Sequence, residues 1–400
     1  MANSPRQPVA LVFGTRPEAI KMAPLVLALR HHPQLKPVVI LTGQHREMVS
    51  QVMDLFDLQA DHDLAIMQPR QTLADITQRC LTGLAPLLTE LQPRCLLVQG
   101  DTTTAFAAAL AAFYQQIPLG HVEAGLRTEQ IYDPFPEEAN RRLISQLAQF
   151  HFAPTAQAVT NLQRSGVLGQ IHHTGNTVID ALLHVAATQP PCPVPGLDWS
   201  RQRVILATVH RRENWGAPLV RIAQALRAIL DRHPDTALLL PLHRNPVVRE
   251  PLQAGLADHP RAWLIEPLDY AALVGAMQRA TLVLTDSGGL QEEAPSLGKP
   301  VLVLRETTER PEAISAGTAQ LIGTDPDTIL ATTSQVLVSP QVYQAFAQAT
   351  NPFGDGQAAQ RILQILSEQV SPPPTLLGVG RKAQGAGQQA YQGHRAQGNR

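Results

Sequence analysis

The sequence has few of the features that mark secreted, membrane-spanning or nucleic-acid-binding proteins. Its 400 residues include only three cysteines, so neither a disulfide framework nor a zinc ribbon is expected. No apolar run approaches the roughly 20 residues of a membrane span, and the polar amino terminus lacks a signal-peptide pattern. Aromatic residues make up 4%, and 33 acidic residues nearly cancel 32 basic ones, which disfavours nucleic-acid and membrane partners. We therefore expect a cytoplasmic protein with reduced thiols.

The sequence does have the alternation that is typical of a parallel α/β protein. Short apolar runs, rich in β-branched residues or leucine, alternate with longer amphipathic stretches. Expected strands are 9–13, 37–42, 95–99, 119–122 and 150–153 in the first half, and 203–209, 237–241, 262–265, 282–285 and 301–304 in the second. Because these strands are apolar throughout, we expect helices to cover both faces of each sheet.

A proline-rich stretch at 189–196 divides the chain into two Rossmann-like domains, which we place at 1–185 and 186–352. We expect a helix at 353–370 that packs back on the first domain, and a disordered tail at 371–400, where glycine, glutamine and alanine dominate. Ligands of such sheets bind at the carboxyl ends of the strands, so the site is expected in the cleft between the domains.

The first expected strand runs into a turn and helix at 14–21 that could bind an anion through Arg16 and Lys21. Pro17 suits a first helical turn, where backbone amides are free. A single glycine is not the G-x-G-x-x-G of a dinucleotide site. The alternative is a helix cap with solvated charges.

Three acidic positions predict acid–base chemistry in the first domain. Asp101 follows the strand 95–99, although it could merely cap the next helix. Glu123 directly follows an apolar strand, so it must face the cleft or be paired. Glu137 follows a rigid proline-containing loop and could instead be a first-turn acid. Carboxylates that converge on one cleft can shift one another's pKa, as proton transfer requires.

The second domain carries the features of a nucleotide site. His210 follows a buried strand and precedes two arginines. Ser287, Gly288 and Gly289 open a helix, where bare amides can hold a diphosphate. Glu293 lies one turn later, where it can accept from a ribose diol, and Arg310 offers a further phosphate partner.

Metal motifs are weak. The D-x-D patterns at 61–63 and 325–327 lie in stretches that we expect to be polar loops, and the paired histidines at 31–32 and 172–173 are expected on the surface or in loops. We expect no metal cofactor.

Taken together, these segments resemble the non-hydrolysing bacterial UDP-N-acetylglucosamine 2-epimerases. Among them are FGTRPEAIKMAP, HVEAGLR and DSGGLQEEAPSLGKP. The matching stretches are 13–24, 42–48, 100–104, 121–127, 136–141, 175–177, 210–214, 286–300, 307–312 and 351–356. The resemblance covers about residues 8 to 368 in order and excludes the tail.

The resemblance implies a glycosyltransferase-B-like fold, two Rossmann-type domains that close over a UDP-sugar, in a homodimer. It implies reversible conversion of UDP-N-acetylglucosamine to UDP-N-acetylmannosamine. The implied mechanism is anti elimination of UDP to give 2-acetamidoglucal, followed by re-addition of UDP. The implied role of the product is to supply the synthesis of envelope polysaccharides. This chemistry needs no cofactor, which agrees with the missing nicotinamide fingerprint.

The resemblance also implies residue roles. Arg16, His210 and Arg310 would attend the diphosphate with Ser287, Gly288 and Gly289, and Glu293 would hold the ribose. Asp101, Glu123 and Glu137 would be the catalytic carboxylates, with His210 beside them and Lys21 in support. Leu268 and Leu273 lie where many relatives have an aromatic or glutamine-bearing loop near the uracil. A second, allosteric UDP-sugar site would involve Gln44, His45, Arg211 and His243.

Alternatives remain at this point. A hydrolysing relative would release UDP and free N-acetylmannosamine, and another relative would act on a UDP-diacetamido sugar. A glycosyltransferase would use the same fold with an acceptor, and a nucleotide-sugar-binding regulator would have no use for the carboxylates.

Overall fold

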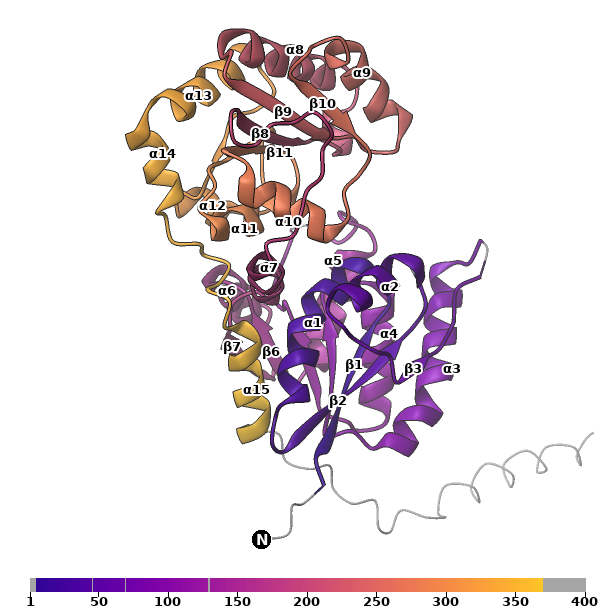
Figure 1. The fold of residues 1–400 in the computed structure, drawn as a ribbon. Helices are drawn as coiled ribbons and strands as arrows, with labels where there is room; N and C mark the ends of the chain where they lie inside the picture. The colour runs from indigo at the N-terminus through magenta and orange to yellow at the C-terminus, as the bar shows by residue number, and fades with distance from the viewer. Residues whose placement is uncertain (1–4, 45, 69, 129, 370–400) are drawn as a thin grey trace, which may run out of the picture.

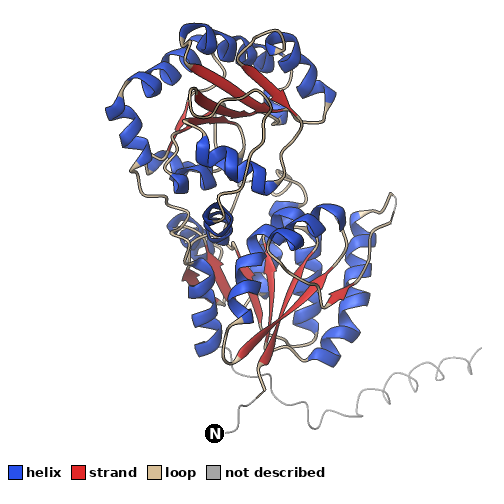
Figure 2. Cartoon of the chain, viewed as in Figure 1, coloured by secondary structure: helices blue, strands red, loops and turns tan. Residues whose placement is uncertain are grey.

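The computed structural model describes residues 5–44, 46–68, 70–128 and 130–369. These residues form two parallel sheets, each covered by helices on both faces and placed one above the other (Figures 1 and 2). Strands such as Val283–Thr285 within the second sheet are fully buried, because both faces are covered. The α/β class predicted from the sequence is confirmed. The expected tail at 371–400 lies outside the described residues.

The first sheet has seven strands in the order β3-β2-β1-β4-β5-β6-β7. Its strands are β1 (Gln7–Phe13), β2 (Leu35–Leu41), β3 (His62–Asp63), β4 (Cys95–Gln99), β5 (Leu119–Val122), β6 (Phe150–Ala153) and β7 (Gln170–His173). The helices of this unit are α1 (Arg16–Arg30), α2 (Arg46–Leu55), α3 (Leu73–Leu91), α4 (Thr103–Tyr114), α5 (Glu137–Leu147), α6 (Ala156–Arg164) and α7 (Thr177–Ala187).

The second sheet has six strands in the order β10-β9-β8-β11-β12-β13. Its strands are β8 (Arg203–Thr208), β9 (Thr236–Pro241), β10 (Ala262–Ile265), β11 (Leu282–Thr285), β12 (Val301–Val303) and β13 (Ala319–Leu321). The α-helices that follow α7 are α8 (Ala217–Arg232), α9 (Pro246–Leu256), α10 (Tyr270–Arg279), α11 (Gly288–Glu293), α12 (Pro311–Ser315), α13 (Pro326–Val338), α14 (Pro340–Ala347) and α15 (Ala358–Gln369). Short 3₁₀ helices lie at Arg212–Asn214 and Ala294–Leu297.

Three edge strands, β3, β7 and β13, were not predicted, because they are short and lack the apolar run of a central strand. The expectation that 61–63 is a loop is therefore wrong, because His62 and Asp63 pair with the end of β2. His172 and His173 belong to the edge strand β7, where His173 is exposed and His172 is half-buried, so the expected surface position is confirmed for His173. The ring of His172 also stacks at 6.1 Å, between ring centroids, from Phe152 in the neighbouring strand.

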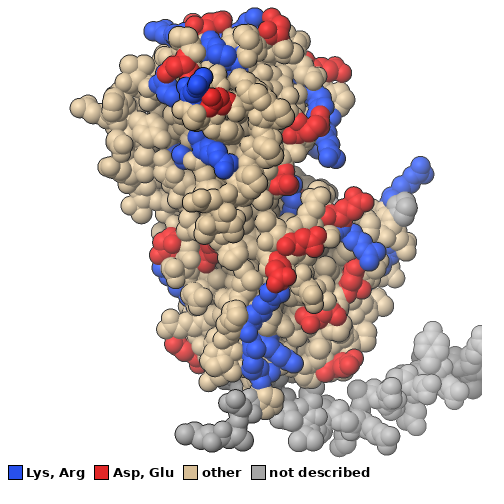
Figure 3. Space-filling view, in the orientation of Figure 1, with Lys and Arg blue, Asp and Glu red and all other residues tan. Residues whose placement is uncertain are grey.

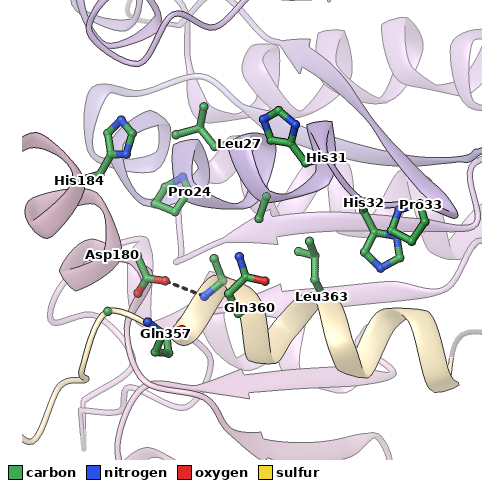
Figure 4. Close-up of a pocket in the computed structure, with 13 residues that line it drawn as sticks. Pro24, Leu27, His31, His32, Pro33, Asp180, His184, Gln357, Gln360 and Leu363 are labelled. Atoms are coloured by element: carbon green, nitrogen blue, oxygen red, sulfur yellow. Dashed lines mark hydrogen bonds between the residues drawn. The ribbon is translucent and has the colours of Figure 1, made fainter.

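The last helix of the described chain, α15, returns to the first unit and packs against α1 and α7 (Figure 1). The side chain of Asp180 on α7 accepts hydrogen bonds from the first turn of α15. The Ala358 amide donates to Oδ2 at 3.2 Å and the Ala359 amide donates to Oδ1 at 2.8 Å (Figure 4). A shallow cavity of about 560 Å³ lies beside this contact. The chain thus crosses between the two units twice, which ties them together.

Charges of both signs are scattered over the face shown in Figure 3, as the balanced composition leads one to expect. Within the described ranges, no helix is both long and apolar enough to cross a bilayer.

Candidate active site

A cavity of about 990 Å³ lies at the carboxyl ends of β4 and β5 and reaches the loop before α12 of the second unit. Charged side chains from both units line it, among them Lys21, Asp101, Glu123, Arg141 and Arg310. This is the edge at which parallel sheets bind ligands. The structure therefore gathers residues from distant parts of the sequence, such as Lys21 and Arg310, which are 289 positions apart.

Glu123 holds an uncommon backbone conformation at the centre of this cavity. Its φ is 61°, in the left-handed region that residues other than glycine seldom occupy. Such a conformation costs of order 1–3 kcal/mol and is concentrated at functional sites. The turn that follows needs glycine, since Gly125 has φ 96° and an added Cβ would lie 2.4 Å from the carbonyl oxygen of Ala158.

The carboxylate of Glu123 is buried against a lysine. Lys21 Nζ lies 2.7 Å from Oε1 and 2.6 Å from Oε2, and the Gln99 side-chain amide also donates to Oε2. Burial opposes ionisation of Glu123, but the charge and hydrogen bonds of Lys21 outweigh it, so the pKa of Glu123 is lowered. Although burial works against it, the same pairing raises the pKa of Lys21. Both groups are therefore charged at neutral pH.

Asp101 lies beside Glu123, but its pKa is shifted in the opposite direction. Burial raises its pKa to about 6, although Arg141 Nη2 lies 2.7 Å from Oδ2 and opposes the shift. The charge of Glu123 adds to the rise. The expectation that Asp101 could cap α4 is wrong, because Thr102 is the N-cap and its Oγ1 accepts from the Ala105 amide at 3.0 Å. The side chain of Asp101 is thus left to face the cavity.

The third predicted carboxylate, Glu137, is not part of the cavity lining. Glu137 begins α5, is half-buried, and its charge contributes to the raised pKa of Asp101, but it is not among the residues that line the cavity. Its neighbour Glu138 is fully buried and serves the local structure: it accepts from the Thr128 amide at 3.0 Å and pairs with Arg142.

The predicted diphosphate cradle has two arginines above it. Ser287 is the N-cap of α11, and its side chain makes no capping hydrogen bond. A Cβ added to Gly288 would lie 3.4 Å from Arg211 Nη2 and 4.0 Å from Arg310 Cζ. Gly289 continues the same turn. The Ser287 amide donates to Thr285 Oγ1 at 2.9 Å, so the cradle offers an anion the turn at Gly288 and Gly289 and the two guanidinium groups beside it.

Buried Asp286 holds His210 at the edge of this cradle. Asp286 Oδ2 accepts from the backbone amides of His210 at 2.9 Å and Arg211 at 2.8 Å, and Oδ1 lies 3.2 Å from His210 Nδ1. Burial lowers the pKa of His210, and the nearby arginine adds to this effect, although Asp286 opposes it. The ring is 38% exposed and stacks on His243 at a centroid distance of 6.0 Å. His210 is therefore oriented, accessible and neutral at physiological pH.

Glu293 is buried at the other end of α11. The Tyr270 hydroxyl donates to its Oε1 at 2.7 Å, and burial raises the pKa of Glu293 to about 7. The charge of half-buried Arg16, on the first unit, acts on the same carboxyl.

The structure also shows residues that the sequence reasoning missed. Glu18 accepts from the amides of Gly14 at 2.9 Å and Thr15 at 2.8 Å, so these amides are not free for an anion, and that expectation is wrong. The T-x-x-E capping box, Thr15 to Glu18, was a signal that could have revealed it. Asn176 and Glu292, which lie between the units, carried no comparable signal.

The structure gives the positions of most of the remaining predicted site residues, and the roles of these residues stay predictions. Leu273 is on α10 and packs, partly buried, against the core. Gln44 accepts from Thr104 Oγ1 at 2.9 Å, and Arg211 Nη2 lies 3.6 Å from Glu309 Oε2. His45 lies outside the described residues. Over the described ranges, no cluster of three or more histidine, cysteine, aspartate or glutamate residues could hold a metal ion.

Known proteins resemble this chain over most of its length. The family model for UDP-N-acetylglucosamine 2-epimerase matches residues 27–367. The UDP-N-acetylglucosamine 2-epimerase of Escherichia coli K12 is 51% identical over 368 residues, which cover 90% of this chain and 98% of the relative. A crystal structure of the Neisseria meningitidis UDP-GlcNAc 2-epimerase bound to UDP-GlcNAc is 47% identical, with TM-score 0.81, and the match covers 90% of this chain and 99% of that one.

A more distant neighbour bears on the fold alone. The glycosyltransferase of kitacinnamycin is 14% identical with TM-score 0.62, and the match covers 92% of this chain and 100% of that one. The glycosyltransferase-B-like arrangement of two Rossmann-like units expected from the sequence is confirmed.

Proposed function

Because this chain belongs to the UDP-N-acetylglucosamine 2-epimerase family, we propose that it interconverts UDP-N-acetylglucosamine and UDP-N-acetylmannosamine by elimination and re-addition of UDP. The enzyme is an isomerase. The elimination route, the identity of the second sugar and the residue roles below are parts of the proposal.

The chemistry of the substrate favours elimination. The hydrogen at C2 is not acidic, so the enzyme must either oxidise a neighbouring carbon or expel the group at C1. Expelling UDP creates negative charge on the diphosphate, which needs cations and backbone amides. It also removes a proton at C2, which needs a base within reach. A cradle with two arginines and a cavity with two carboxylates supply both.

The observation that carries the proposal is the contrast between Asp101 and Glu123. They line one cavity, yet burial raises the pKa of Asp101 to about 6, whereas Lys21 helps to lower that of Glu123 despite its burial. Removal of a proton from one face of C2 and delivery to the other face requires one basic and one acidic group at the same time. Neighbouring carboxyls whose pKa values are shifted in opposite directions suit this exchange, because the one with the higher pKa takes up a proton more readily than the other.

We assign the remaining residues by position. Ser287, Gly288 and Gly289 would bind the diphosphate with Arg310, Arg16 and His210, and Glu293 would accept from the ribose hydroxyls. Leu273 would lie against the uracil. Glu137 would act on the site through its charge, which adds to the raised pKa of Asp101.

The setting of the reaction is also proposed. We place the enzyme in the cytoplasm, where the buried free thiols of its three cysteines would stay reduced. We further propose that it works as a homodimer and that its product feeds the synthesis of envelope polysaccharides. The substrate is the nucleotide sugar itself, and no acceptor or added cofactor enters the reaction.

Proton NMR of the purified enzyme with UDP-N-acetylglucosamine in D₂O, without metal, nicotinamide or acceptor, tests the proposal. The expected result is UDP-N-acetylmannosamine with deuterium at C2 and UDP still attached at equilibrium. Free UDP with free N-acetylmannosamine would instead identify a hydrolysing enzyme. Turnover of only a UDP-diacetamido sugar would keep the chemistry and change the substrate. No turnover of any UDP-sugar without an acceptor would overturn the proposal.

A further inference from the structure

The side chain of Asn176 lies between two buried carboxylates that belong to different units. Its Nδ2 donates to Glu123 Oε1 at 3.1 Å and to Glu292 Oε2 at 2.9 Å. Asn176, Glu123 and Glu292 are 2%, 7% and 2% exposed, so water does not screen this arrangement. Two carboxylates brought together at such depth repel each other strongly unless donors lie between them. The amide of Asn176 supplies both donors.

Each of the two carboxylates also holds a cation on its far side. Lys21 contacts Glu123, and Arg310 Nε donates to Glu292. The five groups therefore form one chain of hydrogen bonds in which donors alternate with carboxylate acceptors. In order, they are Lys21, Glu123, Asn176, Glu292 and Arg310. This chain of hydrogen bonds runs from the proposed proton-transfer carboxylate to the proposed partner of the leaving diphosphate.

Other hydrogen bonds fix the orientation of the Asn176 amide. Its Oδ1 accepts from the Val178 amide at 3.1 Å, as the N-cap of α7, and its own backbone amide donates to the Phe353 carbonyl at 2.7 Å. With the oxygen used at the cap, only the NH₂ group can face the carboxylates. Phe353 precedes α15, so the second chain crossing between the units contacts Asn176.

We propose that Asn176 is a positioning residue of the reaction, whose side-chain amide fixes the carboxylates of Glu123 and Glu292 relative to each other. Binding of the diphosphate at Arg310 is thereby coupled to the position of the Glu123 carboxylate next to C2. The inference rests on the proposed function. A diphosphate that draws Arg310 away from Glu292 leaves Asn176 as the side-chain donor to Glu292 among the described residues. Glu123 keeps Lys21 and Gln99 as donors, and the hydrogen bond from Asn176 ties its position to that of Glu292.

Several charged groups face Glu123 from the surrounding elements, and any pH dependence reflects them all. They are Lys21 on α1, Asp101 after β4, His121 on β5, Glu292 on α11 and Arg310 before α12. Asn176 is uncharged and adds no titration of its own. A change in the pH profile after its substitution therefore reports on the groups that it holds.

The test compares Asn176→Asp and Asn176→Ser, both of which retain a side-chain oxygen for the cap of α7. Asn245→Asp and Asn245→Ser are matched controls, since Asn245 caps α9 through the same contact, Val247 amide to Oδ1 at 3.1 Å. The expected result is a fall in kcat of about tenfold or more in both Asn176 variants, the size of losing a hydrogen bond to a charged group. KM should change less than kcat, and the acidic limb of the kcat/KM profile should move to higher pH, because Glu123 loses a donor to its ionised form. The control variants should match the parent enzyme.

Unchanged kcat and an unmoved acidic limb in Asn176→Ser would overturn the inference, whether or not Asn176→Asp folds. Equal losses in the Asn245 and Asn176 variants would also overturn it, since a cap alone would then explain the effect. An inactive parent enzyme would refute the proposed function and the inference with it. An active parent whose Asn176 variants keep the kcat and the acidic limb of the parent would refute the inference alone.

Discussion

Asp101 and Glu123 follow neighbouring strands, β4 and β5, and line the same cavity, yet the pKa of one carboxyl is raised and that of the other is lowered. Burial acts on both groups. The difference comes from Lys21, which contacts Glu123 at 2.6 Å, whereas Arg141 only partly offsets the burial of Asp101. Strand order thus brings the two carboxyls together, and the difference between their cations separates their pKa values.

Neutralising either carboxyl should abolish turnover without removing nucleotide binding. Asp101→Asn and Glu123→Gln keep the shape of each side chain but remove its proton-transfer chemistry, which is worth about 100- to 10,000-fold in rate. UDP affinity by calorimetry should stay within a few-fold of the parent value, because neither group belongs to the diphosphate cradle. Near-normal rates in both variants would contradict the roles assigned to them.

Variants of the buried pair of Arg310 and Glu292 should affect the stability of the fold and the affinity for UDP in different ways. Arg310→Met leaves the carboxylate of Glu292 buried, 3% exposed, without its cation, which should lower the free energy of unfolding by about 3–5 kcal/mol. Adding Glu292→Gln should restore most of that stability, because the uncompensated charge is gone. UDP affinity should stay low in both variants. Denaturant unfolding and calorimetry measure the two effects, and recovery of UDP affinity in the double variant would contradict the phosphate role of Arg310.

Glu293 should make the folded state less stable as the pH rises. Burial raises its pKa to about 7 from an ordinary 4.5, so between these values the folded chain binds more protons than the unfolded chain, and stability falls with increasing pH. Glu293→Gln keeps an oxygen for the Tyr270 hydroxyl and removes the charge. The variant should be more stable than the parent above neutral pH, by about 1–3 kcal/mol, and equal to it near pH 4. Unfolding curves at the two pH values test this.

The same substitution should weaken nucleotide binding, because a neutral amide is a poorer acceptor than a carboxylate for the ribose hydroxyls. A gain in stability together with a loss of UDP affinity is the pattern expected of a strained binding residue. A variant that gains stability and binds UDP normally would remove Glu293 from the site.

Two glycines with positive φ should respond very differently to alanine. At Gly125 the new Cβ would lie 2.4 Å from a backbone oxygen, which cannot move cheaply, so Gly125→Ala should cost more than about 2 kcal/mol. At Gly166, φ is 62° with no atom within 4 Å of the new Cβ, so Gly166→Ala should cost only about 1 kcal/mol of backbone preference. Thermal unfolding distinguishes them. Loss of turnover should accompany Gly125→Ala alone, because that turn sets Glu123.

Much of the fold could be predicted because its central strands are continuous apolar runs that only a sheet covered on both faces can bury. The edge strands β3, β7 and β13 were not predicted, because they are partly exposed and polar residues such as His173 are tolerated there. The residues that directly follow central strands, Asp101 and Glu123, were predictable for the same reason. Position after a buried strand dictates what they face.

The partners of those residues were harder to predict. Glu292 and Asn176 are 116 positions apart, and each has an ordinary local interpretation as a helical acid or an N-cap. Only the way the two units sit on each other brings them into contact. Glu18 is a different case, because its capping box is local and a closer look at the first helix would have found it.

The most direct test of the account is positional isotope exchange in UDP-N-acetylglucosamine that carries ¹⁸O in the bond between C1 and the diphosphate. The account predicts that ³¹P NMR will show ¹⁸O moving from the bridge into non-bridging positions of the β-phosphate as epimerisation proceeds, because UDP departs and returns. Epimerisation with the ¹⁸O retained in the bridge would contradict it, since the C1–O bond would then never have broken.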